Sequence, residues 1–236
     1  MSEKVVAIQQ PEHLPWIGFF DKMAHCDSYV YLDNVQFKKR YFENRNRIRT
    51  PEGSCWVTVP VYTKGSYHQK ICDVLIDNEQ EWRRKYLGTI KQAYARATGY
   101  GEYMPILSSI IEQPHKKLVE LNIALIEWLR KCFSIGTSVI TASGIRVYDE
   151  TGSDLILAIC KDCDATIYVS GPDGRNYLNH GAFAREGVRV VYHDYQHPQY
   201  QQLASPFVSH MSALDLLMNC GKEGKRFFEE EAPWLF

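Results

Sequence analysis

Residues 5–16 read VVAIQQPEHLPW, and residues 28–37 read SYVYLDNVQF. In each stretch a short apolar run passes directly into polar residues, which is typical of a buried strand that leads into a loop. Between the two runs, the apolar side chains of residues 17–24 recur at helical intervals. This β-loop-α-β order predicts the opening of an α/β sheet.

The last third of the chain returns to the same alternation. Apolar strand-like runs occupy residues 138–141, 166–170 and 188–193, and a helix is predicted from Ser212 to Cys220, ending at Gly221. A capping box is predicted at residues 151–154, with aspartate in place of the usual glutamate or glutamine. We therefore predict an α/β fold with a Rossmann-like, largely parallel sheet.

The middle of the chain has a different pattern. Residues 55–61 and 68–76 indicate two further strands, and residues 79–96 and 116–133 carry apolar residues at i, i+3, i+4 and i+7. We predict one domain over residues 1–236, with residues 79–133 as a helical insertion or lid.

Composition excludes several classes of protein. The formal net charge of −1 argues against bulk electrostatic capture of nucleic acid or of an anionic membrane. The apolar run at residues 5–8 is too short for a signal-peptide core or a membrane span. Seven scattered cysteines show neither disulfide nor zinc-site spacing, so we expect reduced thiols, no metal, no cofactor and a cytoplasmic location.

Polar side chains follow the first two predicted strands at their carboxyl ends, where open α/β sheets bind ligands. His13 is a candidate acid or base, and Asp33 is a candidate base or sugar-hydroxyl ligand. The alternative interpretation is that the first loop shapes a helix entry and that Asp33 is an ordinary turn residue. The substrate-binding candidates at these strand ends are Gln10, Trp16, Asn34 and Gln36.

A basic segment follows at residues 38–49. Its alternating stretch Asn44-Arg45-Asn46-Arg47 is a candidate clamp for a diphosphate, because guanidinium groups offer paired donors that match phosphate oxygens. Such a run is also compatible with a solvated face, and we assign Lys38 and Lys39 to the surface.

The loop at residues 170–177 follows another strand and mixes glycines with a cation. Ser170, Gly171, Arg175 and Tyr177 are candidate anion-binding residues, although no standard phosphate-loop motif is present. Tyr200 and Gln202 belong either to the same rim or to packing and surface. For Ser212 and Asp215, a helix N-cap with a first-turn acid is a simpler explanation than a catalytic triad.

Several of these motifs resemble those of the WbqC-like family. The resemblance rests on QPEHLPWIGFF at residues 10–20, LDNVQF at 32–37 and NRNRI at 44–48, and on shorter matches near Pro60, Ser170, Tyr200 and Asp215. One departure is His13, where the family commonly has tyrosine. The resemblance implies a role in the biosynthesis of O-antigen, other surface polysaccharides or related secondary metabolites.

Together these features predict a transferase. We expect it to move an acyl or aminoacyl group to a nucleotide-linked amino sugar or a carrier-bound intermediate. The expected partners are a phosphorylated small molecule and an acyl carrier protein, and a homo-oligomer is a candidate assembly. The layout is also similar to nucleotidyl transferases with a histidine signature, which leaves ATP-dependent nucleotidyl transfer or ligation as an alternative. The third hypothesis is a non-catalytic, sugar-binding assembly protein.

Overall fold

The computed structural model describes residues 3–65 and 68–229. Its centre is a five-stranded sheet in which every neighbouring pair is parallel, in the order β5-β2-β1-β6-β7. The strands are β1 (Val5–Gln9), β2 (Ser28–Tyr31), β5 (Ser138–Thr141), β6 (Ile167–Ser170) and β7 (Arg189–Tyr192). The predicted α/β fold with a Rossmann-like parallel sheet is confirmed.

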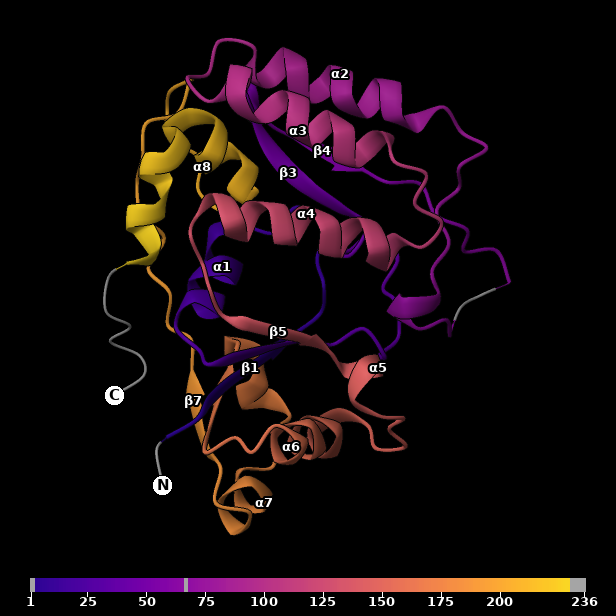
Figure 1. Cartoon of the computed structure of the whole chain (residues 1–236), viewed down its shortest axis with the longest axis vertical. Helices are drawn as coiled ribbons and strands as arrows, with labels where there is room; N and C mark the ends of the chain where they lie inside the picture. The colour runs from indigo at the N-terminus through magenta and orange to yellow at the C-terminus, as the bar shows by residue number, and fades with distance from the viewer. Residues whose placement is uncertain (1–2, 66–67, 230–236) are drawn as a thin grey trace.

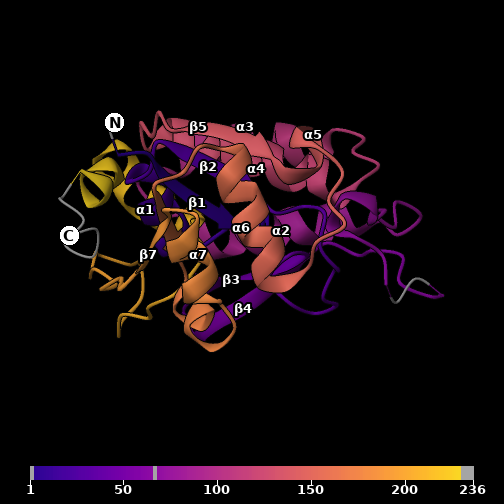
Figure 2. The same cartoon turned by 90° about the horizontal axis from the view of Figure 1, so that it is seen from below.

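Helices cover both faces of this sheet (Figures 1 and 2). The α-helices of the described residues are α1 (Ile17–Ala24), α2 (Trp82–Tyr94), α3 (Tyr100–Glu112), α4 (Leu118–Cys132), α5 (Ala142–Ile145), α6 (Gly152–Asp162), α7 (His180–Arg185) and α8 (Ala213–Cys220). Of these, α2 and α3 lie farther from the sheet, against the β3–β4 hairpin and α4 (Figure 1). Short 3₁₀ helices span Ile71–Asp73, Pro172–Asn176 and Gly221–Phe228. Among the described residues, none of the helices is long and apolar enough to cross a bilayer.

The alternation of side chains along β1 builds two separate cores. Val6 and Ile8 belong to the core beneath the sheet, with residues of α6 and α7. Ala7 points to the opposite side, into the larger core formed with α1, α4 and α8. β1 is therefore buried on both faces, as its unbroken apolar run requires.

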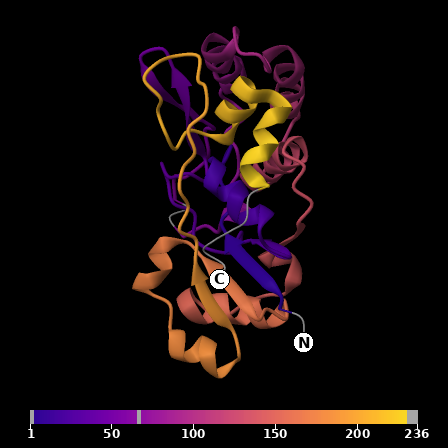
Figure 3. The same cartoon turned by 90° about the vertical axis from the view of Figure 1, so that its left-hand side faces the viewer.

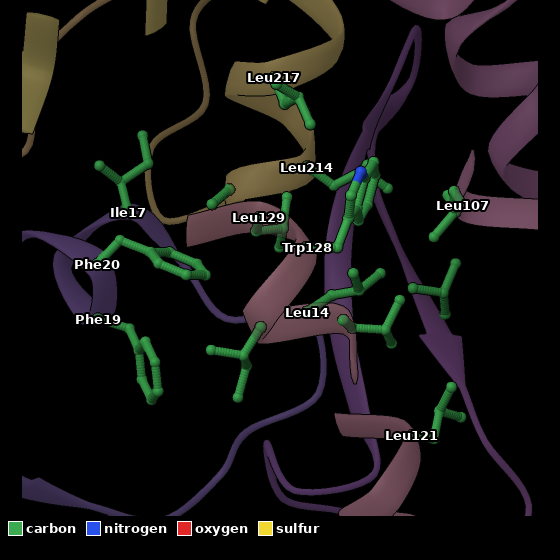
Figure 4. Packing of buried hydrophobic residues seen from close by; sticks show 14 of the residues in the cluster. Leu14, Ile17, Phe19, Phe20, Leu107, Leu121, Trp128, Leu129, Leu214 and Leu217 are labelled. Atoms are coloured by element: carbon green, nitrogen blue, oxygen red, sulfur yellow. The ribbon is translucent and has the colours of Figure 1, made fainter. Parts of the chain in front are cut away.

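The larger core is extended by a two-stranded antiparallel hairpin, β3 (Arg45–Thr50) and β4 (Gly53–Thr58). The hairpin and α2–α4 lie on the same side of the sheet as α1 and α8 (Figures 1 and 3). Figure 4 shows Leu14 packed among Leu121 and Leu129 of α4 and Leu214 of α8. The helices of the middle segment thus share a core with the first loop of the sheet.

Three local predictions differ from the structure. The predicted strand at residues 68–76 is a 3₁₀ helix with isolated bridges, and Arg45–Thr50 is a strand although its sequence is polar. Thr151 precedes α6 without a side-chain cap. By contrast, the predicted N-cap at Ser212 is confirmed, because its hydroxyl accepts a hydrogen bond from the backbone N–H of Leu214.

Candidate functional site

The candidate site is a pocket at the carboxyl edge of the sheet. After β1 the chain continues to β2 on one side, and it later returns to β6 on the other side. The crevice between β1 and β6 is therefore the topological switch point, where open α/β sheets bind their ligands. A pocket of about 290 Å³ lies there. It is lined by Ile8, Gln9, Gln10, Glu12, Lys22, Lys38, Tyr41, Tyr168, Ser170, Gly171, Pro172, Asp173, Gly174 and Tyr177.

Glu12 is held in this pocket by the last residue of β1. The Gln9 amide Nε2 donates to Glu12 Oε1 at 3.1 Å, and the Tyr29 hydroxyl donates to Gln9 Oε1 at 3.3 Å. This order of donors keeps the NH₂ group of Gln9 directed at the carboxyl group. Burial raises the pKa of Glu12 to about 7, against the opposing effects of the Gln9 hydrogen bond and the charge of Lys22.

Lys22 faces the same pocket from α1. Its side chain is only 4% exposed, and burial lowers its pKa to about 8, while the charge of Glu12 acts in the opposite direction. Burial therefore moves the pKa values of Glu12 and Lys22 toward each other, and the charge of each residue opposes the shift of the other. Pairs of this kind are concentrated at functional sites, although structural ion pairs also produce them.

The rim of the pocket combines both signs of charge. Lys38 and Tyr41 come from the segment after β2, and Asp173 and Tyr177 come from the loop after β6. A Cβ atom at Gly174 would lie 2.0 Å from Ser170 Oγ and 2.9 Å from a methyl carbon of Leu178, so a larger residue would require these side chains to move. The loop after β6 thus forms one wall of the pocket.

His13 lies outside the pocket, in the interior behind its first loop. Its Nδ1 is 2.9 Å from Asn122 Oδ1, and its Nε2 is 2.7 Å from the Tyr86 hydroxyl. Because the Asn122 amide Nδ2 already donates to two carbonyls, its Oδ1 accepts from His13 Nδ1–H, and Tyr86 donates to Nε2. Burial lowers the pKa of His13 to about 4, which keeps the ring neutral.

Asn46 supports the same loop from β3. Its Nδ2 donates to the carbonyl oxygens of His13 and Leu14, at 3.2 and 2.9 Å. Leu14 has a φ of +42°, a strained conformation for a branched side chain that these bonds help to hold. Asn44 is also buried and donates to the carbonyl of Val59. These two asparagines bond to backbone groups, and neither lines the pocket.

The predicted residues at the end of β2 serve a different junction. Both carboxylate oxygens of Asp33 accept hydrogen bonds from Ser143, which follows β5. Gln36 is exposed, and its backbone forms an isolated antiparallel bridge with Lys70. Asn34, two residues earlier, is half-buried. The segment after β2 is therefore hydrogen-bonded to the segment after β5, whereas residues after β1 line the pocket.

The remaining candidates are placed on aromatic rings outside the pocket. The guanidinium carbon of Arg45 lies 4.1 Å from the ring centre of Trp56, and that of Arg47 lies 5.8 Å away. Arg175 stacks on Tyr192 at 4.1 Å. Trp16 stacks on His210 with ring centres 5.2 Å apart. The structure does not bring these four side chains together with Glu12.

Of the predicted site residues, Gln10, Ser170, Gly171 and Tyr177 line the pocket together. The sequence interpretation missed Glu12 and Lys22 and assigned Lys38 to the surface. A signal for Lys22 was present, because it falls at i+3 from Phe19 on the apolar stripe of α1, where a solvated lysine is not expected. Among the described residues, no three metal-ligating side chains are grouped to hold an ion.

Comparison with known proteins identifies the relatives of this chain. The model of the WbqC-like protein family matches residues 10–227. The chain belongs to the WbqC-like family. It is 36% identical over 222 residues to the uncharacterized protein Rv1507c of Mycobacterium tuberculosis, covering 93% of this chain and 95% of that relative. No solved structure matches significantly.

Residues of the WbqC-like motif near the carboxyl end form a buried network. The Asp215 carboxylate accepts hydrogen bonds from the hydroxyl groups of Tyr94 and Tyr200, at 2.8 and 2.7 Å, and from the Gln202 amide at 2.8 Å. Asp215 is fully buried, so it is more than a first-turn acid at the start of α8. Tyr200 and Gln202 fasten the segment before α8, and they do not belong to the rim of the pocket.

Proposed function

We propose that this WbqC-like protein is a group-transfer enzyme that acts in the switch-point pocket. It would move an acyl or aminoacyl group to the amine of a nucleotide-linked amino sugar or a carrier-bound intermediate, in surface polysaccharide or related secondary-metabolite biosynthesis. The observation that carries this proposal is the Glu12–Lys22 pair in a pocket at the carboxyl ends of β1 and β6.

Glu12 is the proposed general base. A carboxylate with a pKa of about 7 can accept a proton from an acceptor ammonium group at physiological pH. The freed amine nitrogen would attack the carbonyl carbon of the donor, forming a C–N bond. The bond between that carbon and the leaving group would then break, and the leaving group would depart with the bonding electrons and accept the second proton that the nitrogen loses.

Lys22 and Lys38 are the proposed cations for the leaving group or a donor phosphate. Lys22 is buried, so its charge acts at a lower effective dielectric than that of a surface lysine. Gln10, Ser170 and Tyr177 add neutral hydrogen-bonding groups on the same walls. These residues replace the arginine clamp expected from the sequence, because Arg45 and Arg47 lie on Trp56 instead.

His13 and Asp33, the catalytic candidates from the sequence, have supporting roles in this proposal. His13 holds the loop that carries Glu12, since both of its ring nitrogens are engaged by Asn122 and Tyr86. Asp33 joins the ends of β2 and β5 through Ser143.

The direct test is a turnover screen by mass spectrometry, with acyl thioesters, acyl adenylates and ATP as donors and nucleotide-linked amino sugars as acceptors. For the productive pair, kcat/KM should rise with pH through about 7, as Glu12 ionises, and fall above about 8, as Lys22 loses its proton. A flat profile between pH 6 and 9 would contradict these roles. Pyrophosphate release from ATP would support nucleotidyl transfer instead.

A further inference from the structure

The two outer edges of the β3–β4 hairpin are used differently. On β3, the carbonyl of Arg47 accepts a hydrogen bond from the Ser212 N–H at 2.9 Å, and the Arg49 N–H donates to the Tyr94 hydroxyl at 3.2 Å. The outer edge of β3 is therefore covered by the segment before α8 and by α2. Covered edges of this kind do not recruit further strands.

Among the described residues, the outer edge of β4 has no such cover. The Val59 N–H donates to the Asn44 carbonyl, and the register pairs Asn46 with Val57. In an antiparallel pair, alternate residues point their backbone groups away from the partner strand. Ser54, Trp56 and Thr58 therefore point their N–H and C=O groups outward, where no backbone bond to another described residue is found.

The chain itself already uses the continuation of this edge. Val61 bridges Ile76 in antiparallel orientation, the Tyr62 N–H donates to the Leu75 carbonyl at 3.0 Å, and the Asp77 N–H donates to the Pro60 carbonyl at 2.9 Å. After Asp77 the chain turns away into α2. The edge is thus able to accept an added strand, but its Ser54–Thr58 part is left without one.

A groove of about 470 Å³ runs beside this free edge. Residues 56–60 form one wall and residues 80–89, around the start of α2, form the other. Trp56 is 42% exposed at this wall. A strand edge that faces a helix across a groove is an arrangement to which extended peptides bind by main-chain hydrogen bonds.

Charge favours an acidic occupant. The guanidinium groups of Arg45 and Arg47 flank the Trp56 ring, and Lys85 stands on the α2 wall. Among the described residues that line the groove, the charges of Lys85 and Glu81 cancel, so the excess of positive charge comes from Arg45 and Arg47 beside Trp56.

We propose that the groove between β4 and α2 binds an extended acidic peptide segment, which adds to β4 as a third strand. The segment would belong to a partner protein. This inference does not depend on the proposed transferase activity, because the groove shares no lining residue with the switch-point pocket.

Selection of random dodecamer peptides displayed on phage against the full chain provides the probe. The enriched peptides should be rich in Asp and Glu, and a synthetic copy should bind in a fluorescence anisotropy titration. Methylating its backbone nitrogens one at a time should weaken binding at every second position only, since alternate N–H groups of an added strand face β4.

Thr58→Pro and Thr58→Val form a matched pair of variants. Proline removes an outward N–H without breaking a β3–β4 hydrogen bond, so affinity should fall at least tenfold, whereas valine should leave it unchanged. Circular dichroism checks the fold of both variants. If Thr58→Pro fails to fold, the series of N-methylated peptides, measured with the unaltered protein, still tests whether the peptide adds to β4 as a strand.

Three results would overturn the proposal: no peptide is enriched, the methylation effect lacks a period of two, or a folded Thr58→Pro variant binds as tightly as Thr58→Val. Preferential binding of oligosaccharides over peptides in the same titration would also overturn it. Glu12→Gln should not change peptide affinity, so a failure of the transferase proposal is distinguishable from a failure of this one.

Discussion

Glu12 and His13 are neighbours in the sequence, yet they belong to regions of opposite character. Glu12 lies in the switch-point pocket and has one hydrogen bond, to Gln9. His13 lies in the interior, and both of its ring nitrogens are engaged. Both side chains have strongly shifted pKa values, so a pKa shift alone does not separate a reactive group from a structural one.

The two regions differ in whether their polar side chains are used by the protein itself or face a cavity. Around His13, Asn46 and Asn122 direct their amides at backbone carbonyls of the loop, which fixes its path. In the pocket, the carboxyl group of Glu12 and the ammonium group of Lys22 face a cavity that a ligand can enter. A buried polar network stabilises when all its members are satisfied, whereas an incomplete one is suited to binding.

The largest expected effect is on transfer. Glu12→Gln should lower kcat/KM by about 10²- to 10⁴-fold, the usual contribution of a general base. The free energy of unfolding should change by less than about 1 kcal/mol, because the glutamine side chain has nearly the same shape. Steady-state kinetics and urea denaturation measure the two quantities. Unchanged kinetics would exclude Glu12 as the base.

The second prediction concerns the interior network. Asn122→Ala should destabilise the fold by about 3–5 kcal/mol, since it leaves His13 and the carbonyls of Pro11 and Glu43 without their partner. The exposed Gln113→Ala serves as the control and should change stability by less than about 0.5 kcal/mol. Equal stability of the two variants in urea titrations would argue against a structural role for the network.

The third prediction uses the pKa of His13. Its pKa of about 4 in the folded protein lies below the ordinary value of 6.5. The unfolded chain therefore binds a proton first, and stability should fall by up to about 3 kcal/mol as the pH drops from 6.5 to 4. His13→Gln should flatten this part of the curve of unfolding free energy against pH. An unchanged slope would assign the acid sensitivity to other groups.

The smallest expected effect separates two members of the basic segment. Lys38→Ala should raise KM for a phosphorylated substrate by about two- to fivefold, as expected for an exposed charge at the rim. Arg45→Ala should leave KM unchanged, because that guanidinium group lies on Trp56. The reverse result in the same kinetic assay would return the anion clamp to the arginines.

The inner strands of the main sheet, β1, β2 and β6, were predictable because each is a largely apolar run buried on both faces. β3 was missed because Asn46 occupies a buried position in it, where an apolar side chain would have shown the alternation. Residues 68–76 were assigned wrongly, because a short apolar segment fits a strand and a 3₁₀ helix with bridges equally well. The role of residues 79–133 as a lid stays a prediction.

By itself, the sequence determined the α/β class and the parallel sheet, because hydrophobic periodicity is a local property. Only the tertiary structure decided which strand ends meet. The order β5-β2-β1-β6-β7 brings Gln10 to Ser170 and Asp33 to Ser143, whereas spacing along the chain had suggested that Gln10 and Asp33 share a site. Strand order depends on which apolar faces pack together. The position of a polar residue in the sequence therefore does not show which residue of another strand it will contact.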